Sequence, residues 1–180
     1  MRKLILSLVL VLSTSTFFGQ SVFDKFDGQD NIATVIVNKK MFTLLSKMEV
    51  KDKETQQYVN LIKKLDNLKV FVTESDKKAE DMKAVSDKYI KSSALEELMR
   101  ITEKGKSVKI YVKSGASESQ VKELLMFVDG AAPKNQTVLM SLTGDFDLNE
   151  LSVLTDKMNL PGGDDLKKAS KGAKGPKGAK

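Results

Sequence analysis

The stretch that decides the fold is Val108-Lys109-Ile110-Tyr111-Val112-Lys113, in which apolar side chains alternate with lysine and tyrosine. Successive side chains of a β-strand point to opposite faces of a sheet, so this alternation predicts a strand that buries one face. Similar patterns predict strands at 68–73 and 137–142, and the β-branched stretch 32–37 is also typical of a strand. Strands that cluster late in the chain, separated by short turns, indicate antiparallel pairing.

Between these strands, apolar residues recur at helical spacing. The spacing predicts helices over 39–48, over 58–65 and from Asp147 to Met158. It also predicts a long helical stretch from Ser75 or Asp76 through Ile101 to Gly105, either as one helix or as two helices divided at Lys91-Ser92-Ser93. We expect Asp147 to cap the last helix, with Glu150 as its reciprocal capping partner. The expected fold class is α+β, with a small, largely antiparallel sheet of four to five strands packed against several helices and a strand-rich C-terminal half.

The segment from Val121 to Val128 fits two structures. Its apolar residues have helical spacing, and Ser117 with Gln120 fits a capping box. Leu124 to Val128 is also a continuous apolar stretch of strand length, closed by the turn signal Asp129-Gly130. The pattern alone leaves both structures open.

Four segments in the second half of the chain carry a further pattern. They are Ala-Leu-Glu-Glu-Leu-Met-Arg (94–100), Val-Lys-Ile-Tyr-Val-Lys (108–113), Glu-Leu-Leu-Met-Phe-Val-Asp-Gly (123–130) and Val-Leu-Met-Ser-Leu-Thr-Gly-Asp-Phe-Asp-Leu (138–148). With them the chain resembles an uncharacterised family of small exported bacterial proteins, domain of unknown function 4252, over most of its length up to about Met158. The resemblance implies that 122–128 is a strand. Relatives often accompany extracytoplasmic-signalling regulators, which implies a link to envelope sensing, and the family supplies no activity or site residues.

The N-terminus predicts export. Arg2 and Lys3 precede an apolar stretch from Leu4 to Leu12, and small or polar residues follow it. This is the pattern of a secretory signal peptide, and the stretch is shorter than the roughly 20 residues that span a membrane. A buried N-terminal helix is the alternative. We expect a signal peptide over 1–20, a single α+β domain over 21–160 and an extracytoplasmic location, periplasmic or secreted. Since the chain has no cysteine, we expect a soluble protein rather than a lipoprotein.

The basic character of the chain is concentrated at its two ends. The formal net charge is +6; without Arg2 and Lys3 it falls to +4, and without the six lysines after Leu166 it falls to −2. We expect 161–180 to be a disordered tail rich in lysine, glycine and alanine, because it has almost no large apolar side chain to offset the entropy of ordering. The lysines that could contact an anionic membrane or envelope polymer are Lys167, Lys168, Lys171, Lys174, Lys177 and Lys180. A solvated tail without a partner is the alternative.

The residue set limits the possible chemistry. Without histidine or cysteine, Ser-His-Asp and Cys-His catalysis and the usual zinc sites are excluded. The best metal candidates, Asp145, Asp147 and Asn149, imitate the start of a calcium loop, but Glu150 replaces the glycine required at the sixth position, so we expect a turn and a helix cap. We expect no cofactor. We expect the methionine stripes to fill the core, and a binding surface is the alternative. These methionines are Met41, Met48, Met82, Met99, Met126 and Met140.

The function expected from these features is that of an exported, non-catalytic binding or accessory module of the bacterial cell envelope. Its partner is expected to be an envelope protein or polymer, and nucleic acid is not expected because export removes the protein from most of it. The alternative is a carboxylate-based hydrolase that acts on an envelope substrate. The oligomeric state is left open.

Overall fold

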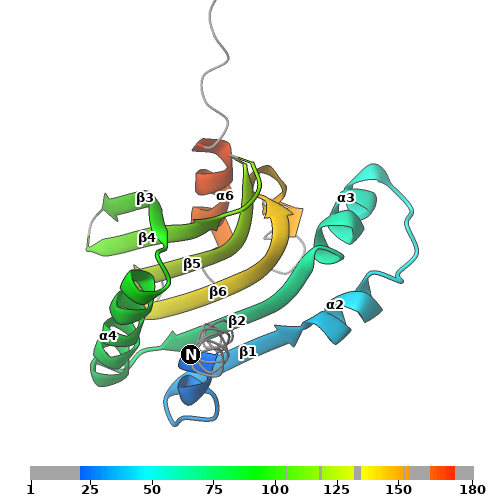
Figure 1. Cartoon of the computed structure of the whole chain (residues 1–180). Helices are drawn as coiled ribbons and strands as arrows, with labels where there is room; N and C mark the ends of the chain where they lie inside the picture. Colours follow the sequence, from blue (N-terminus) through cyan, green and yellow to red (C-terminus); the bar gives the residue numbers. More distant parts are fainter. Residues whose placement is uncertain are drawn as a thin grey trace, which may run out of the picture.

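Within the part of the chain that is described, six strands form one antiparallel sheet (Figure 1). The computed structural model describes residues 21–103, 105–117, 119–131, 135–151, 153–154 and 163–172. The strands are β1 Ile32–Asn38, β2 Leu65–Thr73, β3 Glu96–Glu103, β4 Lys106–Ser114, β5 Gln120–Ala131 and β6 Gln136–Asp147. They lie in the order β1-β2-β6-β5-β4-β3, and every neighbouring pair is antiparallel. The α+β class is confirmed, with six strands instead of four to five.

Helices lie on both faces of the sheet (Figure 1). They are η1 Ser21–Phe26, α2 Lys39–Leu45, α3 Lys53–Ile62, α4 Asp76–Ser92, η2 Leu148–Glu150 and α6 Gly163–Gly172, where η marks a 3₁₀-helix. η1 and α4 pack on one face, whereas α2, α3, η2 and α6 contribute buried residues to the other. Asn38 and Asp52 begin α2 and α3 as N-caps, because each side chain accepts a backbone N–H of the first turn.

The alternation of side chains along the strands divides the core into two clusters. The first cluster contains Val108 and Ile110 of β4 and the buried residues on the same face of β2, β5 and β6. Buried residues of α2, α3, η2 and α6 complete it. The second cluster takes Phe71, Phe127 and Leu139 from the opposite face and packs them against η1 and α4. β5 and β6 are therefore buried on both faces, which explains why residues 124–128 form a continuous apolar stretch rather than an alternating one. The strand expected there from the family resemblance is confirmed.

The sixth strand, β3, replaces the end of the long helical stretch that the sequence predicts. α4 ends first, and the chain turns at Ala94, whose φ is 52°. A β-bulge lies between Glu97 and Met99, and Met99 and Ile101 then pack against the first cluster while Leu98 is exposed. Because the bulge interrupts the two-residue alternation, the apolar residues of β3 have the spacing of a helix.

Two smaller predictions about turns and helix ends were wrong. Gly105 does not end a helix; it lies in the turn between β3 and β4, with a φ of 84°. Asp147 caps a 3₁₀-helix, as its position predicts, but Glu150 does not return to Asp147 and instead pairs with Lys64. The end of the predicted last helix, including Met158, lies outside the described residues.

The C-terminal segment 161–180 contains a helix where the composition predicts disorder. In α6, Leu166 is fully buried in the first cluster. The Asp165 carboxylate, 1 % exposed, pairs with Lys106 Nζ at 2.7 Å. One leucine and one ion pair therefore dock α6 on the sheet, although the average composition of the segment predicts disorder. Residues 173–180 lie outside the described part.

Within the described ranges, no helix is both long enough and apolar enough to cross a membrane. Residues 1–20, where a signal peptide is expected, lie outside those ranges.

Candidate functional site

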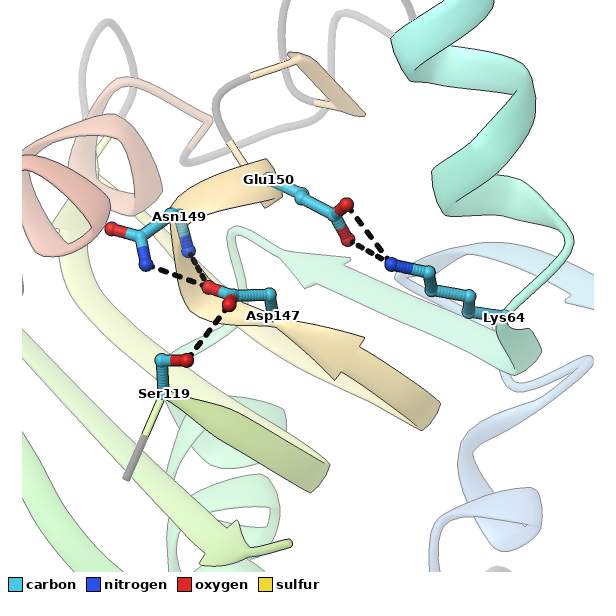
Figure 2. Close-up of polar contacts among 5 residues, drawn as sticks. All are labelled: Lys64, Ser119, Asp147, Asn149 and Glu150. Atoms are coloured by element: carbon cyan, nitrogen blue, oxygen red, sulfur yellow. Dashed lines mark hydrogen bonds and ion pairs between the residues drawn. The ribbon is translucent and has the colours of Figure 1, made fainter. Parts of the chain in front are cut away.

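The residues predicted as metal candidates at the end of β6 do not converge on one point. Asp147 accepts hydrogen bonds from the Asn149 backbone N–H at 2.8 Å, from Asn149 Nδ2 at 2.7 Å and from the Ser119 hydroxyl at 2.7 Å (Figure 2). Asp145 pairs with Lys122 at 2.7 Å instead. In the described ranges, no group of three or more acidic side chains could hold a metal ion.

The electrostatics of Asp147 fit a structural cap. Burial opposes its charge, but the hydrogen bonds from Asn149 and Ser119 outweigh that effect and lower the pKa of the carboxyl. Beside it, Glu150 forms an ion pair with Lys64 at 2.9 Å that links η2 to the chain just before β2 (Figure 2). Both groups therefore hold the end of β6 in place.

Gly144, in the Leu-Thr-Gly-Asp-Phe-Asp-Leu segment at 142–148, lies at a close approach of two backbone segments. A Cβ atom at Gly144 would lie 2.3 Å from the carbonyl oxygen of Lys64 and 2.8 Å from Leu65 Cα. The same carbonyl oxygen accepts the Asp145 backbone N–H at 2.9 Å. The motif thus combines a close backbone approach with a helix cap, and its role is structural.

The most perturbed titratable pair is Tyr89 on α4 and Glu123 on β5. The Tyr89 hydroxyl donates to the Glu123 carboxylate, 2.9 Å from each oxygen, and the two residues are 4 % and 7 % exposed. Burial raises the pKa of Glu123, and burial together with the Glu123 charge raises the pKa of Tyr89. Perturbed pairs are often catalytic when they lie in a cleft. This pair is enclosed between α4 and the sheet, so it fixes α4 in place rather than facing a substrate.

The lysines predicted to contact an anionic surface are divided between two regions. Lys167 lies on α6 and is half-buried, and Lys168 and Lys171 also belong to that helix. Lys174, Lys177 and Lys180 lie outside the described residues. The described part therefore leaves the role of the tail as a prediction.

Within the described residues, four exposed apolar side chains lie on α2 and in the chain just after it. Met41, Leu44, Met48 and Val50 are 49 %, 55 %, 47 % and 42 % exposed, and we call them the α2 strip. Met41 and Leu44 share one face of α2 because they are three residues apart. Met48 and Val50 follow the end of α2, and the Met48 N–H donates to the carbonyl of Leu45 at 3.2 Å in the turn after the helix. Exposed apolar groups of this kind mark interaction sites. The α2 strip is the best candidate for a binding surface.

The expectation that the methionines fill the core holds only in part. Met82, Met126 and Met140 are fully buried, and Met99 is partly buried. For Met41 and Met48 the expectation was wrong. The signal that could have revealed them is the density of apolar residues over 41–48, since one face of so short a helix cannot bury Met41, Phe42, Leu44, Leu45 and Met48 together.

The comparison with protein families matches residues 26–154 to a family described as Domain of unknown function (DUF4252). The chain belongs to this family. The DUF4252 match covers every described strand of the sheet together with α2, α3, α4 and η2; it begins at the last residue of η1 and ends before α6. A search of curated proteins and a search of solved structures each found no match.

Membership of DUF4252 confirms the resemblance drawn from the segments at 94–100 and 108–148. The description of the family names no function, so it adds no catalytic or binding residue to the site. Function has to be argued from the surfaces of this domain.

Proposed function

We propose that this DUF4252 domain is an exported, non-catalytic binding module of the cell envelope that holds a protein partner on the α2 strip. The observation that carries the proposal is that Met41 and Leu44, on one side of α2, and Met48, in the turn that follows α2, are each about half exposed. Methionine side chains are flexible and polarisable, which suits a surface that adapts to the apolar face of a partner. The charged start and short apolar stretch of residues 2–12 support export.

The binding role is also supported by the contacts of the buried and half-buried carboxylates, which hold parts of the fold together. Asp147, Glu150 and Glu123 each hold one element of the fold against another through the contacts described above. Asp165 does the same for α6. The best-placed carboxylates therefore act in packing, whereas the α2 strip has no comparable role within the described fold.

The proposal is tested by site-specific photo-crosslinking in intact cells. A photoreactive side chain placed at Leu44 should give one discrete adduct with an envelope protein, and the same group at Leu98, an exposed leucine on β3, should not. Leu44→Lys should abolish a crosslink made from Met41, because it places a charge in the apolar contact. An adduct pattern that is equal at Leu44 and Leu98 would contradict the proposal.

Export is tested separately by the mass of the protein recovered from the extracytoplasmic fraction. We expect a mature N-terminus between Thr16 and Ser21. An intact N-terminus on a protein confined to the cytoplasm would contradict the envelope role, whatever the result of the crosslinking. Turnover of an envelope substrate that a single carboxylate substitution abolishes would instead support the hydrolase alternative.

A further inference from the structure

The two edge strands of the sheet differ in charge. β3 carries Glu96, Glu97, Arg100 and Glu103, whereas β1 has the sequence Ile-Ala-Thr-Val-Ile-Val-Asn and no charged residue. Soluble proteins protect exposed edges with charged residues, proline or bulges, because an open edge pairs with other chains. β3 has that protection, with charges and a bulge at 97–99, and β1 has none of it.

β1 also exposes apolar side chains on both of its faces. β1 pairs with β2 in continuous register over 32–38, and among the described strands β2 is its one neighbour. Val35 and Ile36, which point to opposite faces, are 48 % and 42 % exposed. A further strand beside β1 would cover both side chains and would satisfy the outward backbone groups of the edge.

We propose that β1 pairs in antiparallel orientation with β1 of a second copy of this chain, about a two-fold axis at Val35. In this register residue numbers of opposing positions add to 70, so Thr34 lies opposite Ile36 of the other copy. Val35 lies opposite its own counterpart. The two sheets then join into one continuous sheet, and the proposal does not rest on the binding role of the α2 strip.

The charges that flank β1 favour a second copy in this orientation. The chain before β1 is acidic, with Asp27 and Asp30, and the chain after it is basic, with Lys39 and Lys40; all four side chains are exposed. Antiparallel pairing brings the acidic end of one copy near the basic end of the other. Since Lys39 already pairs with Asp66, the contact rests on Asp30, in the turn before β1, and Lys40, in the first turn of α2. Parallel pairing would bring like charges together. Because a two-fold axis repeats each contact, one complementary pair acts twice in the dimer.

The first test uses the absence of cysteine from the sequence. Val35→Cys in the otherwise cysteine-free mature chain should oxidise to a covalent dimer, because the two positions face each other across the axis. Leu98→Cys, at an exposed position on the other edge strand, is the matched control and should remain largely monomeric. Equal crosslinking of the two variants overturns the proposal.

The second test measures the dimer dissociation constant by sedimentation of the mature chain. Val35→Lys should weaken the dimer by about tenfold or more, since it places a charge in a contact that excludes water, and Leu98→Lys should leave it unchanged. Asp30→Lys and Lys40→Asp should each weaken it roughly two- to tenfold, and the double variant should recover the wild-type value. A chain that stays monomeric up to millimolar concentration overturns the proposal, and so does a double variant that is weaker than either single variant.

Discussion

Gly144→Ala in β6 should destabilise the domain by about 3 kcal/mol, although it adds only one methyl group. The added Cβ atom would lie 2.3 Å from the Lys64 carbonyl oxygen and 2.8 Å from Leu65 Cα, well under the 3.0 Å below which such contacts are essentially never seen. Both neighbours are backbone atoms, so no side chain can rotate out of the way. The strands themselves have to separate.

The magnitude follows from what that separation breaks. The Lys64 carbonyl oxygen accepts the Asp145 N–H at 2.9 Å, and losing this hydrogen bond costs about 1 kcal/mol. Forcing a group into a closely packed site costs about 2 kcal/mol more. For a domain of this size, the two together lower the unfolding midpoint by roughly 10 °C.

The assay is urea and thermal unfolding followed by circular dichroism, with Gly28→Ala as the matched control. Gly28 has a φ of 69°, and no atom lies within 4 Å of the position that a Cβ atom would take. Gly28→Ala therefore adds backbone strain of about 1 kcal/mol but no clash. The reasoning is refuted if Gly144→Ala is no less stable than Gly28→Ala.

Three further predictions concern the contacts that hold the helices on the sheet. Burial raises the pKa of Glu123, so the stability that its protonated form contributes is present at low pH and lost as the pH rises through the folded pKa. Glu123→Gln, which still accepts from Tyr89, should therefore gain stability relative to wild type in urea titrations as the pH rises above 4.5, the ordinary pKa of the group. Asp147→Ala removes the cap of η2 and the bond from Ser119, and it should cost about 1 kcal/mol in the same measurement. Leu166→Ala should cost about 3 kcal/mol because Leu166 is fully buried in the first cluster, and an unchanged unfolding midpoint would contradict that packing.

The strands that alternate cleanly could be predicted from the sequence, whereas the pattern alone left β5 open and predicted a helix at β3. Val108, Ile110 and Val112 reveal the buried face of β4 directly, because each is two residues from the next and all are buried. In β3 the bulge between Glu97 and Met99 shifts the phase, so local spacing favours a helix. The pairing of β3 with β4 decides the structure there, and pairing is a non-local property that spacing does not contain.

The α2 strip could not be predicted from the sequence for a related reason. Met41 and Met48 have the spacing of a core stripe, and their exposure depends on how much of α2 the sheet can cover. For Asp145, Asp147 and Asn149, the glutamate at the sixth position favours a turn and a helix cap over a calcium loop. In the structure Asp147 caps η2 and Asp145 pairs with Lys122. Composition shows which groups are available, and the tertiary contacts decide which of them are already used.

The order of the strands shows that β1 lies at an edge of the sheet, which its sequence alone does not indicate. Residues 32–38 have the composition of a central strand, since β-branched and apolar residues predominate and no charge is present. The order β1-β2-β6-β5-β4-β3 nevertheless places this strand at an edge, and it places the charged residues 96–103 at the other edge. A central-type strand at an edge conflicts with the way soluble sheets avoid aggregation. Pairing with β1 of a second copy removes the conflict, because each β1 then lies inside a continuous sheet and the protected β3 strands form its two ends.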